Sequence, residues 1–532
     1  MPQHLSLEAR TVPNLLRAAA LRRPDAPFLH FRGASWTFGE VDRKASQFAH
    51  FLGTLNVRAG DKVAIFLPNA PEWIFAWLGC AKANVIYVPI NTEYNGDILA
   101  HQLGKAEVAA IVVAGEFVGR ILHVRDRLPT LRTLIEVDDE GQGLDGGDLV
   151  RVAFADMDAS PDTDVVVPVA HYDPHAIAFT SGTTGPSKGA LAPHCHAVTF
   201  ALDTARTMSL QEGEKIYNSG MPLFHSLASW MGLLPALITC SEYMLLEKFS
   251  ASRFWPEVHS FGATVALGVF TLPPILMKQP PRGDDGRVML RRFIVTQHNE
   301  DFERRYNGCR LLNTYGQTET GCVTLTPYGE PPRPGSCGRV NEETFEVRIV
   351  DDHDNECPIG TPGEITVRPK LPYVMMSEYY NMPAETNAAF RNLWFHTGDR
   401  GKMDEDGYMY FVDRKKDAMR RRGENISSYE IESVINRHEA VLECAVVAVP
   451  SPFGEDDLKA VVIVKPGETI SHLELWAFFE DNMPRFWIPR YIEFRDGLPK
   501  TPNQKVLKYQ IREQGILGDC MDREALSASI EA

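Results

Sequence analysis

Most of the chain before residue 400 repeats one pattern, an apolar strand followed by a loop and an amphipathic helix. Residues 62–67, 85–90 and 108–113 are short apolar runs, which is typical of buried strands. Residues 71–83 and 97–106, which lie between these runs, favour helices. Strands and helices that alternate at this spacing predict βαβ units. We therefore expect an α/β fold with parallel sheets that carry helices on both faces.

A second, smaller unit is predicted after the composition changes near residue 410. Residues 428–437 favour a helix with Ser428 as its N-cap, and residues 441–449 and 459–464 favour strands. We place the domain boundary at Lys416, at the end of a charged connector. The expected domains are a large N-terminal domain, residues 1–416, and a small α+β domain, residues 417–532.

Composition excludes several classes of protein. Asp and Glu number 70 against 54 Lys and Arg, and the formal net charge of −16 would repel the phosphates of nucleic acid. The nine cysteines form no CxxC pair, which argues against a zinc ribbon or a thioredoxin-type site. The N-terminus lacks the order of a signal peptide, and prolines interrupt the uncharged residues 216–241. We expect a buried helix there, no membrane span and a cytoplasmic protein.

Residues 180–189 (TSGTTGPSKG) follow a short apolar strand and combine glycines, hydroxyl side chains and a lysine. Glycine lets backbone N–H groups approach phosphate oxygens, and hydroxyl and ammonium groups donate to them. The loop lacks the Walker A order, because Ser187 precedes Lys188 and Gly189 follows it. Composition alone fits a polyphosphate loop or a flexible surface loop. The candidate phosphate-binding residues are Thr180, Ser181, Gly182, Thr183, Thr184, Gly185 and Lys188.

Further motifs follow downstream in a fixed order. They are residues 313–319 (NTYGQTE), 394–399 (WFHTGD), 423–425 (GEN) and 499–505 (PKTPNQK). In this order and spacing the chain resembles the acyl-adenylate-forming superfamily of acyl- and aryl-CoA synthetases, peptide-synthetase adenylation domains and firefly-type luciferases. The resemblance covers essentially the whole chain. It implies a large AMP-binding domain that includes a small β subdomain, and a mobile C-terminal lid domain.

The resemblance also implies roles in the first step, the attack of a carboxylate on the α-phosphate of ATP. That step joins two anions, so it needs cations and oriented donors. Thr318 would donate to the α-phosphate, Glu319 would hold Mg²⁺, and Lys505 would reach the α-phosphate and acyl oxygens. The Tyr315 ring would face the adenine, and Asp399 would accept from the ribose hydroxyls. The other expected nucleotide-binding residues are Asn313, Gly316 and Arg414, besides the loop around the β- and γ-phosphates.

In the second step of the superfamily, a thiol attacks the acyl-AMP after the small domain rotates. Lys416 falls on the hinge position, where an exposed charged residue suits a pivot. Gly423 would leave room for the narrow pantetheine arm of CoA. The basic residues 414–422 would steer ATP and CoA into the site, although a solvated charged face is the simpler explanation for such a run.

The resemblance places the acid pocket beside these motifs. Its candidate residues are Phe224, His225, Trp230, Gly268, Thr296, Gln297 and His298, with His225 also a catalytic candidate. Residues 295–299 (VTQHN) replace a Gly-Gly stretch that is common in the superfamily, and Gln504 replaces the glycine before Lys505. These departures resemble the subgroup of bacterial carnitine/crotonobetaine-CoA ligases. An aromatic wall of Trp230, Trp255 and Phe270 would suit a cationic, an aryl or a bulky alicyclic acid.

We therefore expect an ATP- and Mg²⁺-dependent carboxylic acid:CoA ligase that forms acyl-AMP, releases pyrophosphate and then transfers the acyl group to CoA. Two alternatives remain open. One is an adenylating enzyme that loads the thiol of a carrier protein in trans, and the other is a nucleotide-binding pseudoenzyme. The expected partners are a small carboxylic acid, ATP and CoA, without nucleic acid, and a homodimer is compatible with the sequence.

Overall fold

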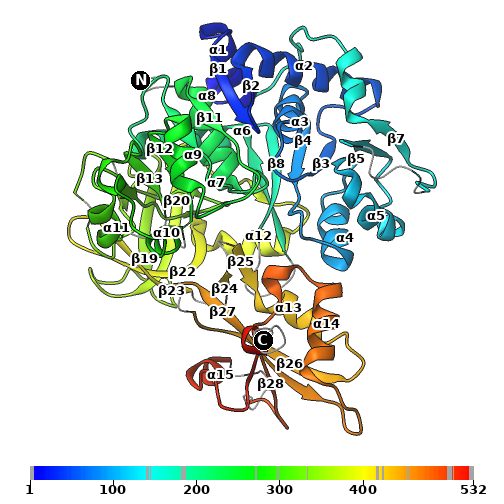
Figure 1. Cartoon of the computed structure of the whole chain (residues 1–532), viewed down its shortest axis with the longest axis vertical. Helices are drawn as coiled ribbons and strands as arrows, with labels where there is room; N and C mark the ends of the chain where they lie inside the picture. Colours follow the sequence, from blue (N-terminus) through cyan, green and yellow to red (C-terminus); the bar gives the residue numbers. More distant parts are fainter. Residues whose placement is uncertain are drawn as a thin grey trace. The chain divides into compact units, whose positions relative to one another are not determined.

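A computed structural model gives the structure of the chain (Figure 1). It describes residues 5–138, 143, 145–180, 187–269, 272–295, 299–326, 328–331, 333–414, 418–421, 424–451, 454–499, 506 and 508–526. The chain divides into two compact units. Unit 1 comprises Met1–Thr92, Leu99–Phe179 and Gly189–Asp413, and unit 2 comprises Glu93–Ile98, Thr180–Lys188 and Arg414–Ala532.

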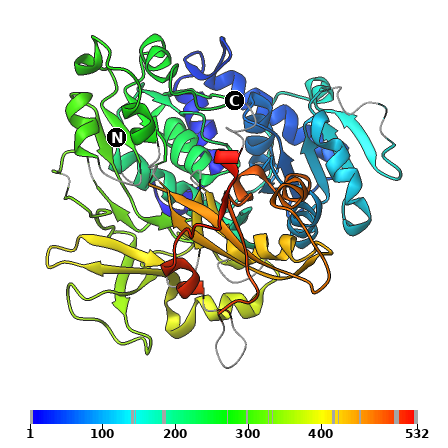
Figure 2. The ribbon, with the colours of Figure 1, turned by 60° about the horizontal axis from the view of Figure 1, so that its bottom comes forward.

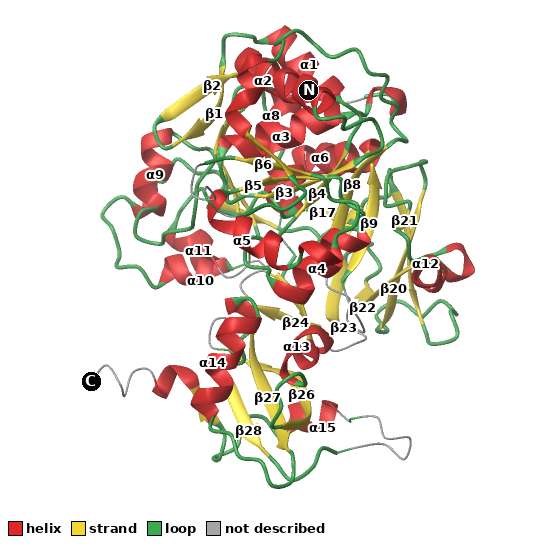
Figure 3. Cartoon of the chain, turned by 90° about the vertical axis from the view of Figure 1, so that its right-hand side faces the viewer, coloured by secondary structure: helices red, strands yellow, loops and turns green. Residues whose placement is uncertain are grey.

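The first large sheet has eight strands, which Figure 3 shows in yellow among the helices. They are β3 (Lys62–Phe66), β4 (Ile86–Pro89), β5 (Ala110–Val113), β6 (Thr133–Glu136), β7 (Val150–Ala153), β8 (Pro174–Thr180), β9 (Lys188–Pro193) and β21 (Glu378–Tyr379). Their order is β21-β9-β8-β4-β3-β5-β6-β7. Pairing is parallel from β8 through β7, and β21 pairs antiparallel with β9. The predicted βαβ pattern and α/β class are confirmed.

The second large sheet has seven strands. They are β1 (Pro27–Phe31), β2 (Ala34–Thr37), β10 (Lys215–Tyr217), β11 (Glu242–Met244), β12 (Val265–Leu267), β13 (Arg292–Ile294) and β14 (Arg310–Leu312). Their order is β14-β13-β12-β10-β11-β1-β2, and all pairs are parallel except β1 with β2. Four parallel neighbours, β10, β12, β13 and β14, therefore end at one edge of this sheet.

Helices cover these sheets. They are α1 (Val12–Arg22), α2 (Phe38–Thr54), α3 (Pro71–Lys82), α4 (Gly96–Lys105), α5 (Gly115–His123), α6 (His194–Thr207), α7 (Ser226–Ala228), α8 (Leu234–Thr239), α9 (Phe254–Phe261), α10 (Leu272–Met277), α11 (Glu300–Arg305) and α12 (Pro383–Ala389). Helix α3 is buried on every side except at Glu72, and it packs against α2. A helix that is apolar all round belongs in the core of a large domain. Trp73 and Trp77 are among the largest fully buried side chains.

Unit 1 also contains smaller antiparallel pieces. They are β15 (Gly316–Gln317) with β16 (Gly321–Cys322), β17 (Thr324–Leu325) with β18 (Arg339–Val340), and the sheet of β19 (Phe345–Val350), β20 (Gly363–Pro369), β22 (Phe395–Met403) and β23 (Met409–Arg414). Phe345, Ile365, Val367 and Met409 share a buried cluster beneath the four-stranded sheet. This sheet corresponds to the small β subdomain that the resemblance implied.

The C-terminal part of unit 2 is orange to red in Figure 2. Its elements are β24 (Ala418–Arg421), β25 (Glu424–Ser427), α13 (Ser428–Ile435), β26 (Val441–Pro450), β27 (Asp456–Val464), α14 (His472–Asn482), β28 (Tyr491–Phe494), α15 (Lys508–Glu513) and β29 (Met521–Asp522). Trp476, Phe479 and Trp487 are buried in its core. Ser471 and Glu474 form a capping box at the start of α14, as their spacing favours. The predicted small α+β fold is confirmed, while the position of the hinge at Lys416 lies outside the described residues.

The buried helix expected within residues 216–241 is present over residues 226–239, and the buried polar residues Asn218 and Ser219 precede it. Strand β10 ends at Tyr217, an irregular segment follows, and α7 and α8 flank a π-helical turn at Ser229–Leu233. Asn69 Nδ2 donates to the Met221 carbonyl in the irregular segment, which a continuous helix would not allow. In the part of the chain that the structure describes, no helix is long and apolar enough to cross a membrane.

Candidate active site

The predicted phosphate loop connects two neighbouring strands of the eight-stranded sheet. Strand β8 ends at Thr180 and β9 begins at Lys188. Thr180 Oγ1 donates to the Lys188 carbonyl at 3.5 Å, which joins the two ends of the loop. Gly189 is required by close packing, because a Cβ there would lie 2.6 Å from Ile177 Cγ2. Ser181, Gly182, Thr183, Thr184 and Gly185 lie outside the described residues.

Asp399, the expected ribose ligand, is a buried carboxylate with 4% exposure. Tyr315 Oη and Gln317 Nε2 both donate to Asp399 Oδ2, each at 2.8 Å. Burial, reinforced by the Asp399 charge, raises the pKa of Tyr315 well above its ordinary value, so the hydroxyl stays protonated. The structure thus brings together two predicted residues. It also adds Gln317, which the sequence analysis missed although it stands inside the 313–319 motif.

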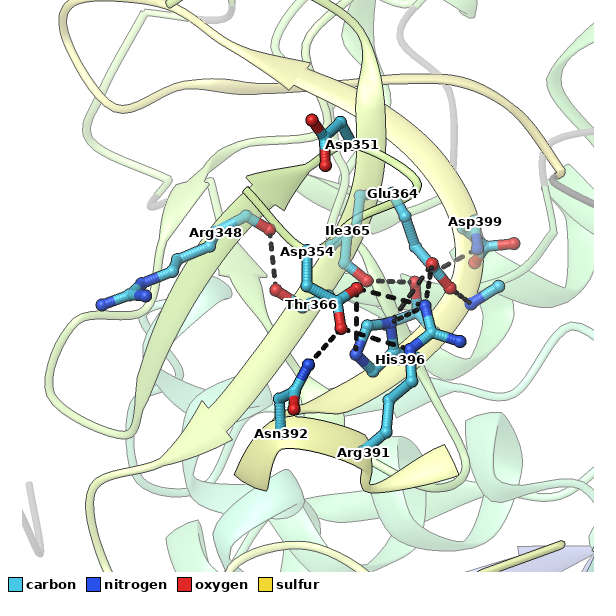
Figure 4. A network of polar contacts seen from close by, with 12 residues as sticks. Arg348, Asp351, Asp354, Glu364, Ile365, Thr366, Arg391, Asn392, His396 and Asp399 are labelled. Atoms are coloured by element: carbon cyan, nitrogen blue, oxygen red, sulfur yellow. Dashed lines mark hydrogen bonds and ion pairs between the residues drawn. The ribbon is translucent and has the colours of Figure 1, made fainter. Parts of the chain in front are cut away.

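A local turn of the backbone inside strand β22, where its pairing with β20 is irregular, presents Asp399 (Figure 4). Gly398 adopts φ +72°, in the left-handed region that favours glycine. Thr397 Oγ1 donates to the Ile365 carbonyl at 2.7 Å and accepts from the Asp399 N–H at 3.2 Å. The Gly398 N–H donates to Glu364 Oε1 at 3.3 Å. Side chains from β20 and β22 therefore hold the backbone of this turn.

Glu364 belongs to a charged network behind the turn (Figure 4). Arg391 Nη2 donates to Glu364 Oε2 at 3.2 Å and to His396 Nδ1 at 2.9 Å. Because arginine only donates, His396 Nδ1 is the acceptor in that bond. Burial acts to raise the pKa of Asp354, but hydrogen bonds from Arg391 and Asn392 bring it below its ordinary value. No motif spacing links these residues, so the network could not be predicted from the sequence.

Thr318 and Glu319 lie in the connection between β15 and β16. This hairpin is very tight, because a Cβ on Gly316 would lie 1.9 Å from the Gly321 carbonyl oxygen. Gly316 was predicted to contact the nucleotide, and this clash gives it a structural reason to be glycine. His196 Nε2 lies 2.9 Å from the Thr318 carbonyl oxygen, which anchors the hairpin to α6. Burial lowers the pKa of His196 to about 4, so the imidazole is neutral near pH 7.

Glu319, the expected metal ligand, is buried with 7% exposure. Tyr379 Oη donates to Glu319 Oε1 at 3.0 Å, and the Met376 N–H donates to the Glu319 carbonyl at 2.9 Å. Among the described residues, no group of three or more His, Cys, Asp or Glu side chains could hold a metal ion. Mg²⁺ commonly binds through one or two carboxylates together with water and phosphate oxygens. The buried carboxylate of Glu319 is a ligand of the type that Mg²⁺ uses in this way.

Asn313, also predicted to bind the nucleotide, uses both ends of its amide inside the protein. Asn313 Nδ2 donates to the Ser336 carbonyl at 2.6 Å, and Asn313 Oδ1 accepts from Thr326 Oγ1 at 2.8 Å. Next to it, the Tyr315 N–H donates to Thr324 Oγ1 at 2.8 Å. The observed contacts of Asn313 therefore brace the segment that carries Tyr315.

The predicted acid-pocket segments follow the ends of neighbouring parallel strands. His225 follows β10, Gly268 follows β12 and Val295 follows β13, while Asn313 follows β14. Because carboxyl ends of parallel strands meet at one edge of a sheet, these segments belong to the same edge. Ligands of open α/β sheets bind in the crevice outside that edge.

His225 is half-buried and caps α7, since its Nδ1 accepts from the Leu227 N–H at 3.2 Å. That bond assigns the proton of a neutral His225 ring to Nε2. Asn69 holds the preceding segment. Its Nδ2 donates to the Met221 and Leu246 carbonyls, at 2.9 Å and 2.8 Å, and its Oδ1 accepts from the Leu223 N–H at 2.8 Å. Asn69 was not predicted, because nothing in the sequence links it to a segment far downstream.

Trp230 and Trp255 are both buried, and each contacts aromatic neighbours. Trp230 Nε1 donates to Tyr87 Oη at 2.7 Å, and its ring contacts His196. The Trp255 ring lies 4.4 Å from that of Tyr306, centroid to centroid. The aromatic wall, which also includes Phe270, remains a prediction. Gly268 has no room for a side chain, because a Cβ would lie 2.6 Å from Leu272 Cδ1, and Phe224 is half-buried.

Several predicted residues are not placed. Thr296, Gln297, His298, Lys416, Gly423 and Lys505, together with Phe270 of the proposed wall, lie outside the described residues, and of Arg414 only the backbone at the end of β23 is described. Their roles remain predictions.

Known families and relatives match both parts of the chain. Residues 16–380 match the family described as AMP-binding enzyme, and residues 430–505 match the AMP-binding enzyme C-terminal domain. The crotonobetaine/carnitine–CoA ligase of Salmonella typhimurium is 33% identical over 487 residues, which cover 90% of this chain and 93% of that protein.

Solved structures share the fold. A double mutant of o-succinylbenzoate CoA synthetase from Bacillus subtilis, bound to a product analogue, superposes with a TM-score of 0.81 at 23% identity, covering 94% of this chain and 98% of that one. ATP-bound MatB from Rhodopseudomonas palustris gives a TM-score of 0.68 at 26% identity, with coverage of 94% and 98%. The predicted architecture of a large sheet-and-helix domain with a smaller C-terminal domain is thus confirmed.

Tyr315→Phe removes the hydroxyl that donates to Asp399 and leaves the ring in place. We expect the KM for ATP to rise roughly 2- to 12-fold, the effect of one lost hydrogen bond of about 0.5–1.5 kcal/mol, while the KM for the acid stays unchanged. The measurement is pyrophosphate release over an ATP titration. Tyr410→Phe is the control, because Tyr410 Oη donates to Asp404 instead. An unchanged KM for ATP in Tyr315→Phe would contradict the role assigned to this pair.

Proposed function

This chain belongs to the family of AMP-binding enzymes, and we propose that the residues around Asp399 and Glu319 form the nucleotide site of its reaction. The enzyme is an ATP-dependent, AMP-forming acid:CoA ligase that works through an acyl adenylate. The acid carboxylate attacks the α-phosphorus of ATP and pyrophosphate leaves. The CoA sulfur then attacks the acyl carbon of the acyl-AMP, a new thioester bond forms, and AMP leaves.

The observation that carries the site proposal is the pair of donors on one oxygen of Asp399. Tyr315 and Gln317 are both uncharged, so they fix the carboxylate without cancelling its charge. A carboxylate held in this way accepts hydrogen bonds from the two hydroxyls of a ribose. The aromatic ring of Tyr315, whose hydroxyl contacts Asp399, would offer a flat face to the adenine. We propose that the nucleoside binds at this place.

We propose that Thr318 and Glu319, at the tip of the adjacent hairpin, serve the phosphates. The Thr318 hydroxyl would donate to an α-phosphate oxygen, and Glu319 would hold Mg²⁺ beside it. Bound Mg²⁺ would neutralise charge on the phosphate oxygens. Thr180 and Lys188, at the two ends of the phosphate loop, would complete the binding of the β- and γ-phosphates.

For the acid we propose a small carboxylic acid with a quaternary ammonium group, as in the name of the Salmonella relatives. The proposal is supported by the 33% identity to this relative over 90% of the chain. The test is pyrophosphate release with carnitine, crotonobetaine, benzoate, a cyclohexane carboxylate and butyrate, each with and without CoA. We expect turnover with the first two only, and acyl-CoA as the product.

Other outcomes of this panel overturn specific parts of the proposal. Turnover with benzoate or the cyclohexane carboxylate alone would replace the substrate class with an aryl or alicyclic acid. Pyrophosphate release with carnitine but no acyl-CoA would favour the thiol of a carrier protein as the acceptor. No release with any acid would favour the pseudoenzyme.

We propose that Lys505 serves the adenylation step alone. Lys505→Ala should slow acyl-AMP formation by roughly 10²- to 10³-fold, as loss of one oriented donor in a transition state does. Thiolysis of supplied acyl-AMP by CoA should be retained. Each half-reaction is measured separately, with Lys465→Ala as the control, because Lys465 Nζ donates to the Glu439 carbonyl at the surface. An equal loss of both half-reactions would contradict the assignment.

We propose that Lys416 is the hinge for rotation of the small domain between the two steps. Lys416→Pro fixes one backbone torsion at this position, so it should hold the enzyme in one arrangement. We expect adenylation to be spared and acyl-CoA formation to be lost, as measured by pyrophosphate and thioester assays. Lys416→Ala keeps the backbone free and should retain both activities. Full CoA turnover in Lys416→Pro would exclude the hinge.

We place the enzyme in the cytoplasm. All nine cysteines are free thiols, which suits a reducing compartment, and ATP and CoA are its co-substrates. Fractionation of cells that express the native chain tests this placement.

A further inference from the structure

One short segment, residues 375–380, contacts Glu319 through both its side chain and its backbone. Tyr379 Oη donates to Glu319 Oε1 at 3.0 Å. Three residues earlier, the Met376 N–H donates to the Glu319 carbonyl at 2.9 Å. Tyr379 and Glu319 are both buried, with 4% and 7% exposure. The carboxylate and the main chain of Glu319 are therefore held by the same few residues.

The same segment is paired with the strand that leaves the phosphate loop. The Ser377 N–H donates to the Leu191 carbonyl at 2.8 Å, and the Tyr380 N–H donates to the Gly189 carbonyl at 2.8 Å. Tyr379 itself stands opposite Ala190 in the β21–β9 pair. Residues 375–380 thus link Glu319 to the start of β9 by hydrogen bonds, although Glu319 and β9 are far apart in the sequence.

The Tyr379 side chain is packed among apolar neighbours. The ring lies in a buried cluster with Ala190, Met375 and Phe395. The Tyr379 N–H donates to Thr386 Oγ1 at 3.0 Å, which ties the backbone to α12. A side chain locked by its neighbours holds a functional group within the narrow limits that a binding site needs.

We propose that Tyr379 is a positioning residue for the metal–nucleotide complex, because its hydroxyl sets the direction in which the Glu319 carboxylate faces. The inference rests on the proposed role of Glu319. A hydroxyl donates a hydrogen bond to a carboxylate oxygen without bringing a positive charge, whereas an ammonium or guanidinium group at this place would compete with the metal. Through β21, the orientation of the carboxylate is tied to the strand that leaves the phosphate loop.

The test is the equilibrium affinity of the full chain for ATP, measured by calorimetry with saturating Mg²⁺ and again with EDTA. Tyr379→Phe removes only the hydroxyl. We expect the Kd for ATP in Mg²⁺ to rise roughly 2- to 12-fold and the Kd in EDTA to stay unchanged. Tyr380→Phe is the matched control. It removes a hydroxyl that donates to Glu107 at 2.8 Å, away from Glu319, and should change neither Kd.

Two further variants keep the result decisive. Glu319→Gln should lose most of the Mg²⁺-dependent gain in ATP affinity, and adding Tyr379→Phe to it should cost nothing more, since the two groups act as a unit. Thr386→Val removes the hydroxyl that anchors the Tyr379 backbone. It should give a smaller loss of ATP affinity, again only with Mg²⁺. This variant replaces Tyr379→Phe if Tyr379→Phe does not fold.

The outcomes separate this inference from the proposed function. If Glu319→Gln loses the Mg²⁺ effect while Tyr379→Phe keeps the native affinity in Mg²⁺, the inference is overturned and the metal role of Glu319 stands. An equal loss in Mg²⁺ and in EDTA would show that Tyr379 only supports the fold, which also overturns it. A Glu319→Gln variant with the native Mg²⁺ effect would overturn the metal role itself.

Discussion

Two buried carboxylates, Asp399 and Glu319, impose the main constraint on this active site. Removing a carboxylate from water is costly unless hydrogen bonds replace the lost hydration. Here the replacements include neutral groups, the hydroxyls of Tyr315 and Tyr379 and the amide of Gln317. Neutral donors lower the cost of burial without removing the charge. In the site that we propose, one carboxylate would therefore act on hydroxyl groups and the other on a cation.

The backbone must then be rigid enough to keep these short contacts. Gly398 supplies a left-handed turn at Asp399, and Gly316 allows a hairpin in which two backbones nearly touch. Behind the first turn, Glu364 receives a backbone N–H and is itself paired with Arg391 (Figure 4). The parallel strands contribute by ending at a common edge, so that segments far apart in the sequence become neighbours. The candidate residues lie in segments that follow or interrupt strands, so the sheets determine where these residues are placed.

Much of this could be predicted from the sequence, and the exceptions have physical causes. Alternation of strands and helices identified the βαβ units, because the periodicity of a buried strand differs from that of a helix. Tyr315 and Asp399 could be predicted because they stand in motifs with fixed spacing. Asn69, Glu364 and Tyr379 could not, since each acts through contacts with residues far away in the sequence. The buried helix expected within residues 216–241 occupies only residues 226–239, because a low content of charge indicates burial but does not distinguish helix from irregular backbone.

Asn313 shows how inactivating substitutions in such a site should be interpreted. It stands inside the nucleotide motif, and both ends of its amide are bonded to neighbouring backbone and side-chain groups. A survey of inactivating substitutions would score Asn313 beside Tyr315 and Asp399, because its two bonds support the segment that carries Tyr315. Loss of activity at a motif position is therefore not a measure of contact with the substrate. In this chain, inactivating substitutions will identify residues that support the site as well as residues that bind its substrates.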